Sequence, residues 1–396
     1  MPLEGIKILD LSRVPPGHVC TMMLGDLGAE VLKVEAPPGP SILPPFSGVS
    51  PLDDEEGRKT AACYPLNRNK KSIVLNLRDE KAREVLYKLA KDADVLLEGF
   101  RPGVMKKLGA DYETMAKINP KLVYCSISGY GQDGPYRLLP GHDINYISFG
   151  GALGIIGTAD SPAIPSNLVG DFAGGSLHAV AGILTAIIAR DKTGKGQYVD
   201  VSMTDGVVSL LAWITSDYFY QGTVLKRGEG LLSGQEPFYG VYRTKDDKFL
   251  SVGCIEPHFW ENLCRHLGRE DFIPHEMAEA EKKQEILTYF QEVFRTKTRD
   301  EWFEELKEKN VAVGKVYDID EVFTDPQVLH RQMLVKVPHP TLGEVPQVGI
   351  ALKLSDTPGR IRSTAPVLGE HTGETLQKLG YTEEEIGILR STGAVS

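Results

Sequence analysis

The sequence predicts an α/β protein built on an open parallel sheet, joined to a smaller module. Two patterns and the composition support this fold class. Short apolar runs alternate with helical patterns along roughly the first third of the chain, which favours parallel strands with ligands at their carboxyl ends. A pair of strand patterns separated by a short turn occurs much later. Apolar residues make up 41% of the 396 residues and charged residues 25%, which is typical of globular domains.

The expected elements follow in chain order. Five strands are predicted from buried, β-branched or aliphatic runs at residues 6–11, 31–35, 72–77, 95–98 and 122–127. Helices are predicted at 19–28, 80–90, 170–190 and 199–220, and residues 37–51 are predicted as a Pro- and Gly-rich loop. The later module is predicted to hold strands at 240–243 and 249–253 with a turn at 246–247, a charged helical region at 277–309, an extended region from 335 and a short helix at 374–380.

Composition excludes several functional classes. The net charge of −10, from 44 basic and 54 acidic residues, disfavours nucleic acid as the main partner. The five cysteines show no CxxC pair, so we expect free thiols and no metal site. The longest apolar run, near 179–189, is shorter than the roughly 20 residues of a membrane span. We therefore expect a cytoplasmic protein without a membrane span, while an organellar location stays open.

Residues 129–134 match the pattern GxGxxG directly after a predicted strand. A dinucleotide site needs a helix to begin within that motif, so that its N-terminus faces the pyrophosphate. Here Pro135 follows at once, and the motif comes after the fifth strand and not the first. We interpret it as a Gly-rich turn.

Three polar positions are candidate catalytic residues. His142 follows a Pro-Gly turn, Asp171 stands between apolar residues ahead of two glycines, and Glu256 ends a predicted strand. Each has a structural alternative: a capping or core histidine, a helix N-cap, and an exposed turn acid, respectively. An Asp at a helix start can serve both purposes.

Two groups of residues near predicted strand ends are candidates for binding a phosphorylated ligand by charge-assisted hydrogen bonds. The alternative for both is a solvated surface. The first group is Arg68, Asn69, Lys70 and Lys71, and the second is Gly99, Phe100, Arg101 and Lys107.

Ordered motifs along nearly the whole chain resemble the class III CoA-transferase family (CaiB/BaiF type), and most closely its α-methylacyl-CoA racemase branch. The motifs are residues 5–10 (GIKILD), 25–30 (GDLGAE), 69–72 (NKKS), 98–103 (EGFRPG), 129–135 (GYGQDGP), 194–197 (GKGQ) and 368–372 (LGEHT). The resemblance implies an interlocked homodimer. Its large Rossmann-like domain would combine residues 1–200 and 345–396, and linkers at 201–224 and 321–344 would flank a small α+β domain at 225–320.

The resemblance also implies the site and two alternative chemistries. Racemases of the family carry His, Asp and Glu at the positions of His142, Asp171 and Glu256, and they interconvert 2-methylacyl-CoA epimers by proton transfer. Transferases use the Asp as a nucleophile, and formyl-CoA transferases have Tyr-Glu where this chain has His142-Asp143. We expect a racemase, with CoA transfer as the alternative. Its substrate is an acyl-CoA, and no cofactor beyond CoA is expected.

Two further expectations concern details of the site. An Arg that often helps to hold the adenine end of CoA in the family is replaced by Ala36, so we expect Lys33 or Arg68 to compensate. Backbone N–H groups at the start of the helix that carries Asp171 are expected to stabilise the enolate oxygen.

Overall fold

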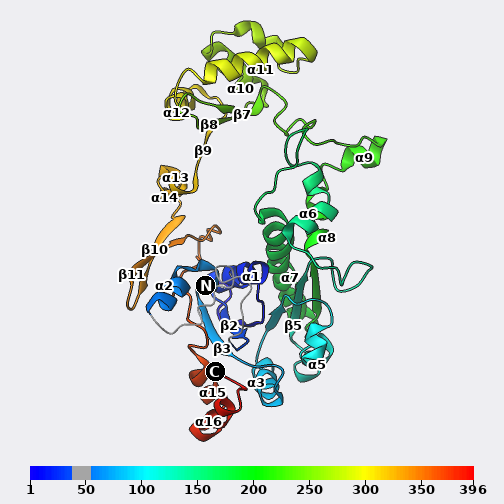
Figure 1. Cartoon of the computed structure of the whole chain (residues 1–396), viewed down its shortest axis with the longest axis vertical. Coiled ribbons are helices and arrows are strands. Elements are labelled where there is room, and N and C mark those ends of the chain that lie inside the picture. The colour runs from blue at the N-terminus through cyan, green and yellow to red at the C-terminus, as the bar shows by residue number, and fades with distance from the viewer. Residues whose placement is uncertain (38–54) are drawn as a thin grey trace. The chain divides into compact units, whose positions relative to one another are not determined.

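The computed structural model describes residues 1–37 and 55–396 of the chain (Figure 1). Contacts divide them into two compact units. The first contains Met1–Gly150, Pro165–Leu211 and Pro326–Ser396, and the second contains Gly151–Ile164 and Ala212–Asp325. The first unit is thus assembled from both ends of the chain.

A parallel sheet forms the centre of the first unit, and it has six strands among the described residues, in the order β3-β2-β1-β4-β5-β6. This confirms the α/β fold class. The order reverses between β1 and β4, and ligands of doubly wound sheets bind at the carboxyl ends of the strands at such a point. The strands are β1 (Lys7–Asp10), β2 (Glu30–Glu35), β3 (Lys70–Val74), β4 (Val95–Glu98), β5 (Val123–Ser128) and β6 (Tyr198–Ser202).

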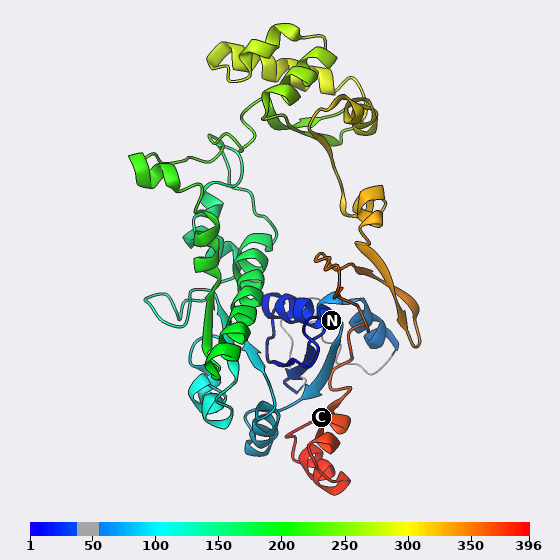
Figure 2. The same cartoon turned by 180° about the vertical axis from the view of Figure 1, so that it is seen from behind.

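Two hydrophobic clusters cover the two faces of this sheet. One cluster joins it to α3, α5 and the C-terminal helices α15 and α16, and the other joins it to α1 and α7, which lie side by side in Figure 2. The helices of the first unit are α1 (Pro15–Asp26), α2 (Glu55–Cys63), α3 (Glu80–Ala90), α4 (Val104–Lys107), α5 (Tyr112–Ile118), α6 (Asp143–Phe149), α7 (His178–Thr193), α8 (Met203–Leu210), α14 (Pro326–His330), α15 (Thr372–Lys378) and α16 (Glu383–Ser391).

The segment predicted as one helix over 199–220 contains strand β6, so that prediction is wrong. Val199 and Val201 are β-branched and alternate with polar residues, which suits a strand beside β5 better than a helix. Helix follows only in α8 and in α9 (Ser216–Gln221), which belongs to the second unit. The predictions also omitted α16.

The helix predicted over 170–190 is present in two parts. A π-helix, η3 (Leu168–Leu177), continues directly into α7. Together they are long and apolar enough to cross a membrane by length and composition alone. This is weak support for a span, because Ala179 and Ile183 of α7 are fully buried in the core beside β5 and β6, as in the core helix of a globular unit.

The second unit contains an antiparallel sheet in the order β7-β8-β9. The predicted strand pair is confirmed in β7 (Tyr239–Arg243) and β8 (Phe249–Gly253), whereas β9 (Val313–Val316) was not predicted. Aromatic side chains, including Trp260, Phe290 and Trp302, fill its core. Its remaining helices are α10 (Pro257–His266), α11 (Ala280–Phe294), α12 (Arg299–Leu306) and α13 (Ile319–Val322).

The extended region after residue 335 forms an antiparallel hairpin of β10 (Leu334–His339) and β11 (Gly343–Val348). The loop predicted at 37–51 lies outside the described residues, apart from residue 37. The GxGxxG segment begins no helix: the chain turns through it and helix resumes only at Asp143, which agrees with the interpretation as a Gly-rich turn.

Candidate active site

The start of α1 and the π-helix η3 meet near the carboxyl end of β1. The Ser176 hydroxyl donates to the Pro16 carbonyl at 2.7 Å and to the Asp171 carbonyl at 3.2 Å. Because α1 follows β1 directly, these bonds place the segment that carries Asp171 beside the point where the strand order reverses.

Glycines allow the π-helix to approach its neighbours closely. A Cβ at Gly174 would lie 2.6 Å from the Met203 carbonyl oxygen, and one at Gly206 of α8 would lie 2.2 Å from the Gly174 carbonyl oxygen. Only glycine fits backbones at such distances. The small-residue pattern of this region therefore reflects close packing of η3 against α8. π-Helical turns are frequent at functional sites.

Asp171 is half-buried in the first turn of η3. Its backbone N–H donates to Asp143 Oδ1 at 2.8 Å. Burial, together with the nearby Asp143 carboxylate, raises the pKa of Asp171 to about 6, although a hydrogen bond with Asn167 acts in the opposite direction. A carboxyl group with this pKa can both hold and release a proton near neutral pH.

His142 is exposed and immediately precedes α6. Its backbone N–H donates to Asn145 Oδ1 at 3.1 Å, which caps the helix. The next residue, Asp143, is buried and reaches the Asp171 backbone, so the segments that carry His142 and Asp171 meet here. Asp143 Oδ2 is buried and has no hydrogen-bond partner among the described residues.

Glu256 lies in the second unit, where it is exposed and precedes α10. It follows the end of β8, as the sequence predicted. Its role beside His142 stays a prediction.

The first group has three buried members, and each of them has a partner within the chain. Arg68 donates to Asp26 through two nitrogens, at 2.6 and 3.0 Å, and Lys70 Nζ lies 3.1 Å from Asp10 Oδ2. The Asn69 amide also donates to Asp26, at 2.8 Å. These contacts give the three residues partners within the chain, and their role in binding a phosphorylated ligand stays a prediction. Lys71 is exposed and pairs with Glu374.

Both residues that are expected to compensate for Ala36 have partners within the chain. Lys33 is buried, and its Nζ lies 2.8 Å from His18 Nε2 and 3.1 Å from the Ser12 carbonyl oxygen. Arg68 is equally buried and committed to Asp26. Either cation would have to leave these partners to reach a ligand. Leaving a buried partner unpaired costs free energy.

The second group borders the carboxyl end of β4. Gly99 and Phe100 are half-buried, whereas Arg101 and Lys107 are exposed and form no ion pair with a described residue. The Arg13 guanidinium, which follows β1, lies 5.0 Å from the centroid of the Phe100 ring. Sequence analysis missed Arg13 because 87 residues separate it from Phe100, and no local pattern shows that β1 and β4 are neighbours.

Of the backbone N–H groups expected to stabilise the enolate oxygen, the one of Asp171 donates to Asp143. No cluster of three His, Cys, Asp or Glu residues suited to a metal ion occurs in the part of the chain that the structure describes.

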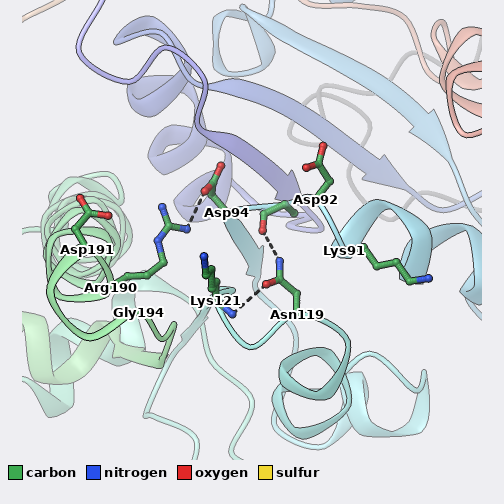
Figure 3. A pocket seen from close by; sticks show the side chains of 9 residues that line it. Lys91, Asp92, Asp94, Asn119, Lys121, Arg190, Asp191 and Gly194 are labelled. Atoms are coloured by element: carbon green, nitrogen blue, oxygen red, sulfur yellow. Dashed lines mark hydrogen bonds and ion pairs between the residues drawn. The ribbon is translucent and has the colours of Figure 1, made fainter.

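A pocket of about 490 Å³ lies at the amino ends of the strands, opposite the carboxyl ends where the candidate site is (Figure 3). It borders the residues that precede β4 and β5, and Arg190 pairs there with Asp94 at 2.8 Å. It includes none of the predicted site residues.

The model of CoA-transferase family III matches residues 3–372. The chain belongs to this family. Among curated family members, the human α-methylacyl-CoA racemase is 36% identical over 393 residues, covering 99% of this chain and 97% of that protein. The human succinyl-CoA:glutarate CoA-transferase is 33% identical over 407 residues, covering 100% of this chain and 90% of that protein. Racemases and transferases of the family are thus comparably similar to this chain, which is an enzyme of family III.

A solved structure of a CaiB/BaiF family protein from Brucella suis has a TM-score of 0.80 with 30% identity, covering 96% of this chain and 99% of that one. The fold of the family therefore extends over nearly the whole chain.

Proposed function

We propose that this family III enzyme is an α-methylacyl-CoA racemase that interconverts (2R)- and (2S)-2-methylacyl-CoA thioesters. The observation that carries the proposal is the contact between Asp143 and the Asp171 backbone, which brings the His142 and Asp171 segments together. An imidazole and a carboxyl group at one site supply the two proton-transfer groups that a two-base mechanism needs.

In this mechanism one group removes the α-proton of the thioester, and the electron pair of that C–H bond moves into the carbonyl as an enolate. The second group, protonated beforehand, then delivers its proton to the opposite face of the α-carbon. His142 acts as base while Asp171 acts as acid, and in the reverse direction the roles exchange. The pKa of Asp171, raised to about 6 by burial and by Asp143, supports this exchange because it lies near the ordinary value of an imidazole, about 6.5.

For substrate binding, we propose that CoA contacts Gly99, Phe100, Arg101 and Lys107, with Lys71 at the edge of the site. The exposed cations supply charge-assisted bonds to phosphate. Glu256 is proposed to orient the His142 ring. We propose a homodimer, as the family resemblance implies, in which the second unit of the partner contributes to closing the site.

The second candidate is CoA transfer between carboxylic acids. It is favoured by the similarity to succinyl-CoA:glutarate CoA-transferase, which is nearly as great as that to the racemase. In this chemistry the ionised Asp171 attacks the thioester carbonyl, CoA leaves as the thiolate, and a mixed aspartyl anhydride forms. The CoA thiolate attacks the aspartyl carbonyl, which releases the donor carboxylate and leaves an aspartyl-CoA thioester. The acceptor carboxylate displaces CoA to form a second anhydride, and CoA then attacks its acceptor acyl carbonyl, which gives the new acyl-CoA and frees Asp171.

The test incubates one enantiomer of a 2-methylacyl-CoA with the enzyme in D₂O, without an acceptor acid. The racemase hypothesis predicts deuterium at the α-carbon together with loss of optical purity. A complete lack of exchange across several acyl chains, together with a covalent adduct on Asp171 in the presence of acceptor acids, would establish transfer instead.

A further inference from the structure

Glu98 is a buried carboxyl group at the carboxyl end of β4, with a side chain only 3% exposed. Its Oε2 accepts the backbone N–H of Phe100 at 2.7 Å, and its Oε1 accepts the hydroxyl of Ser126 on β5. A buried carboxylate is costly unless hydrogen bonds satisfy it. Glu98 therefore holds the main chain at the point where it leaves the sheet.

The bond to Phe100 also fixes the surroundings of its ring. The Arg13 guanidinium lies over that ring, and it forms no ion pair with a described residue. Arg13 follows β1 and Phe100 follows β4, so the pair straddles the point where the strand order reverses. An aromatic face beside a guanidinium that has no ion pair with a described residue is suited to a ligand that combines a flat base or an amide with phosphate.

We propose that Glu98 is a positioning residue for the CoA thioester. By accepting the Phe100 N–H, Glu98 fixes the turn at residues 99–101 and holds the Phe100 ring against Arg13. This inference rests on the proposed function, in which that turn contacts CoA. In its ionised form Glu98 accepts both hydrogen bonds, and the Phe100 N–H meets a charged oxygen. In its protonated form Oε1 donates toward Ser126, and the neutral Oε2 accepts the Phe100 N–H more weakly, so the hold on the turn weakens.

Both forms of Glu98 occur near neutral pH. Burial raises the pKa of its carboxyl to about 7, and the charge of Asp200 adds to this, while the bonds from Ser126 and Phe100 lower it. The titratable groups that face it among the described residues are Tyr124 and Cys125 on β5 and Tyr198 and Asp200 on β6. Tyr198 donates to Ser126 Oγ at 3.0 Å. When Glu98 is protonated, the Ser126 hydroxyl can turn its hydrogen away and accept the proton of Glu98 as well.

The experiment is calorimetric titration of the full chain with CoA between pH 6 and 8, for the wild type and for Glu98→Gln. Wild-type affinity should rise about five- to tenfold over this interval, beyond any change caused by the phosphates of CoA itself. Glu98→Gln is neutral at every pH, so it should bind like the wild type at pH 6 and supply the baseline for the ligand's own ionisation. In turnover, the variant should show a raised KM for the thioester and little change in kcat.

Ser126→Ala is the matched control, since it removes the other hydrogen bond of Glu98 and leaves the Phe100 contact. Loss of that bond raises the pKa of Glu98 further, so the rise in affinity should move to higher pH, and the affinity at pH 7 should fall below that of the wild type. Thermal unfolding checks that the wild type and Glu98→Gln are both folded. If their CoA affinities then change with pH in parallel, the proposal is overturned. If Glu98→Gln does not fold, an unmoved profile in Ser126→Ala overturns it. A wild-type chain that binds no CoA refutes the proposed function itself.

Discussion

The carboxyl group of Asp143 accepts the backbone N–H of Asp171 at 2.8 Å, across 28 residues of chain. The second oxygen of Asp143 is buried without a hydrogen-bond partner among the described residues. The contact therefore has two effects: it fixes the start of the π-helix, and it places negative charge beside the Asp171 carboxyl group. The second effect raises the pKa of Asp171, in addition to the larger effect of burial.

Replacing Asp143 with Asn should lower the pKa of Asp171. The amide oxygen still accepts the Asp171 N–H, so the fold is kept while the charge is lost. The limb of the pH–rate profile of α-proton exchange that reports Asp171 should move from near 6 to lower pH. Asp247→Asn, at an exposed turn of the second unit, is the control and should leave the profile unchanged. An unshifted limb in Asp143→Asn would show that burial alone sets this pKa.

His142→Ala should abolish racemisation, together with α-proton exchange of the epimer that His142 deprotonates, while CoA binding is retained; exchange of the other epimer through Asp171 should persist with its configuration kept. Loss of one general acid–base group reduces rates by about 10²–10⁴-fold. Deuterium incorporation from D₂O measures the exchange, and calorimetric titration measures the binding. Racemisation, or equal exchange of both epimers, in this variant would contradict the role of His142, whereas retained transfer to an acceptor acid would support the alternative reaction.

Gly170→Ala should damage the site by steric overlap. An added Cβ would lie 2.6 Å from Asp143 Oδ1, so the contact between Asp143 and Asp171 has to shift. We expect a loss of stability of about 1–3 kcal/mol in urea unfolding, together with reduced exchange. Gly387→Ala in α16 is the matched control, because nothing lies within 4 Å of its added Cβ. That variant should be as stable as the wild type or more stable, by up to about 1 kcal/mol. Equal stability of the two variants would show that α6 adjusts freely.

Local patterns in the sequence predicted β4 and α3 with their observed bounds, because buried strands and amphipathic helices carry their own periodicity. They failed at β6, where apolar residues after a long helix were taken as its continuation. They also did not show that Arg68 and Lys70 pair with carboxylates: a basic run before a strand looks the same whether its side chains meet solvent or carboxylates from distant segments. Asp26 and Asp10 lie 42 and 60 residues away from these partners. The pairings of Asp143 and Arg13 depend on the same long-range topology.

Lys70 and Lys71 are neighbours whose substitutions should differ sharply. Lys70→Met leaves the buried Asp10 carboxylate without its nearest cation, and removal of one partner of a buried ion pair costs about 3–5 kcal/mol. Lys71→Met removes only a partly exposed pair with Glu374, which contributes at most about 1 kcal/mol. Urea unfolding of both variants measures the difference, and CoA titration separates stability from binding. If Lys70 served mainly as a phosphate contact, its variant would keep wild-type stability and lose affinity for CoA. The fully buried Lys70 Nζ, bonded to Asp10, to Asn67 and to the His18 carbonyl, predicts the opposite result.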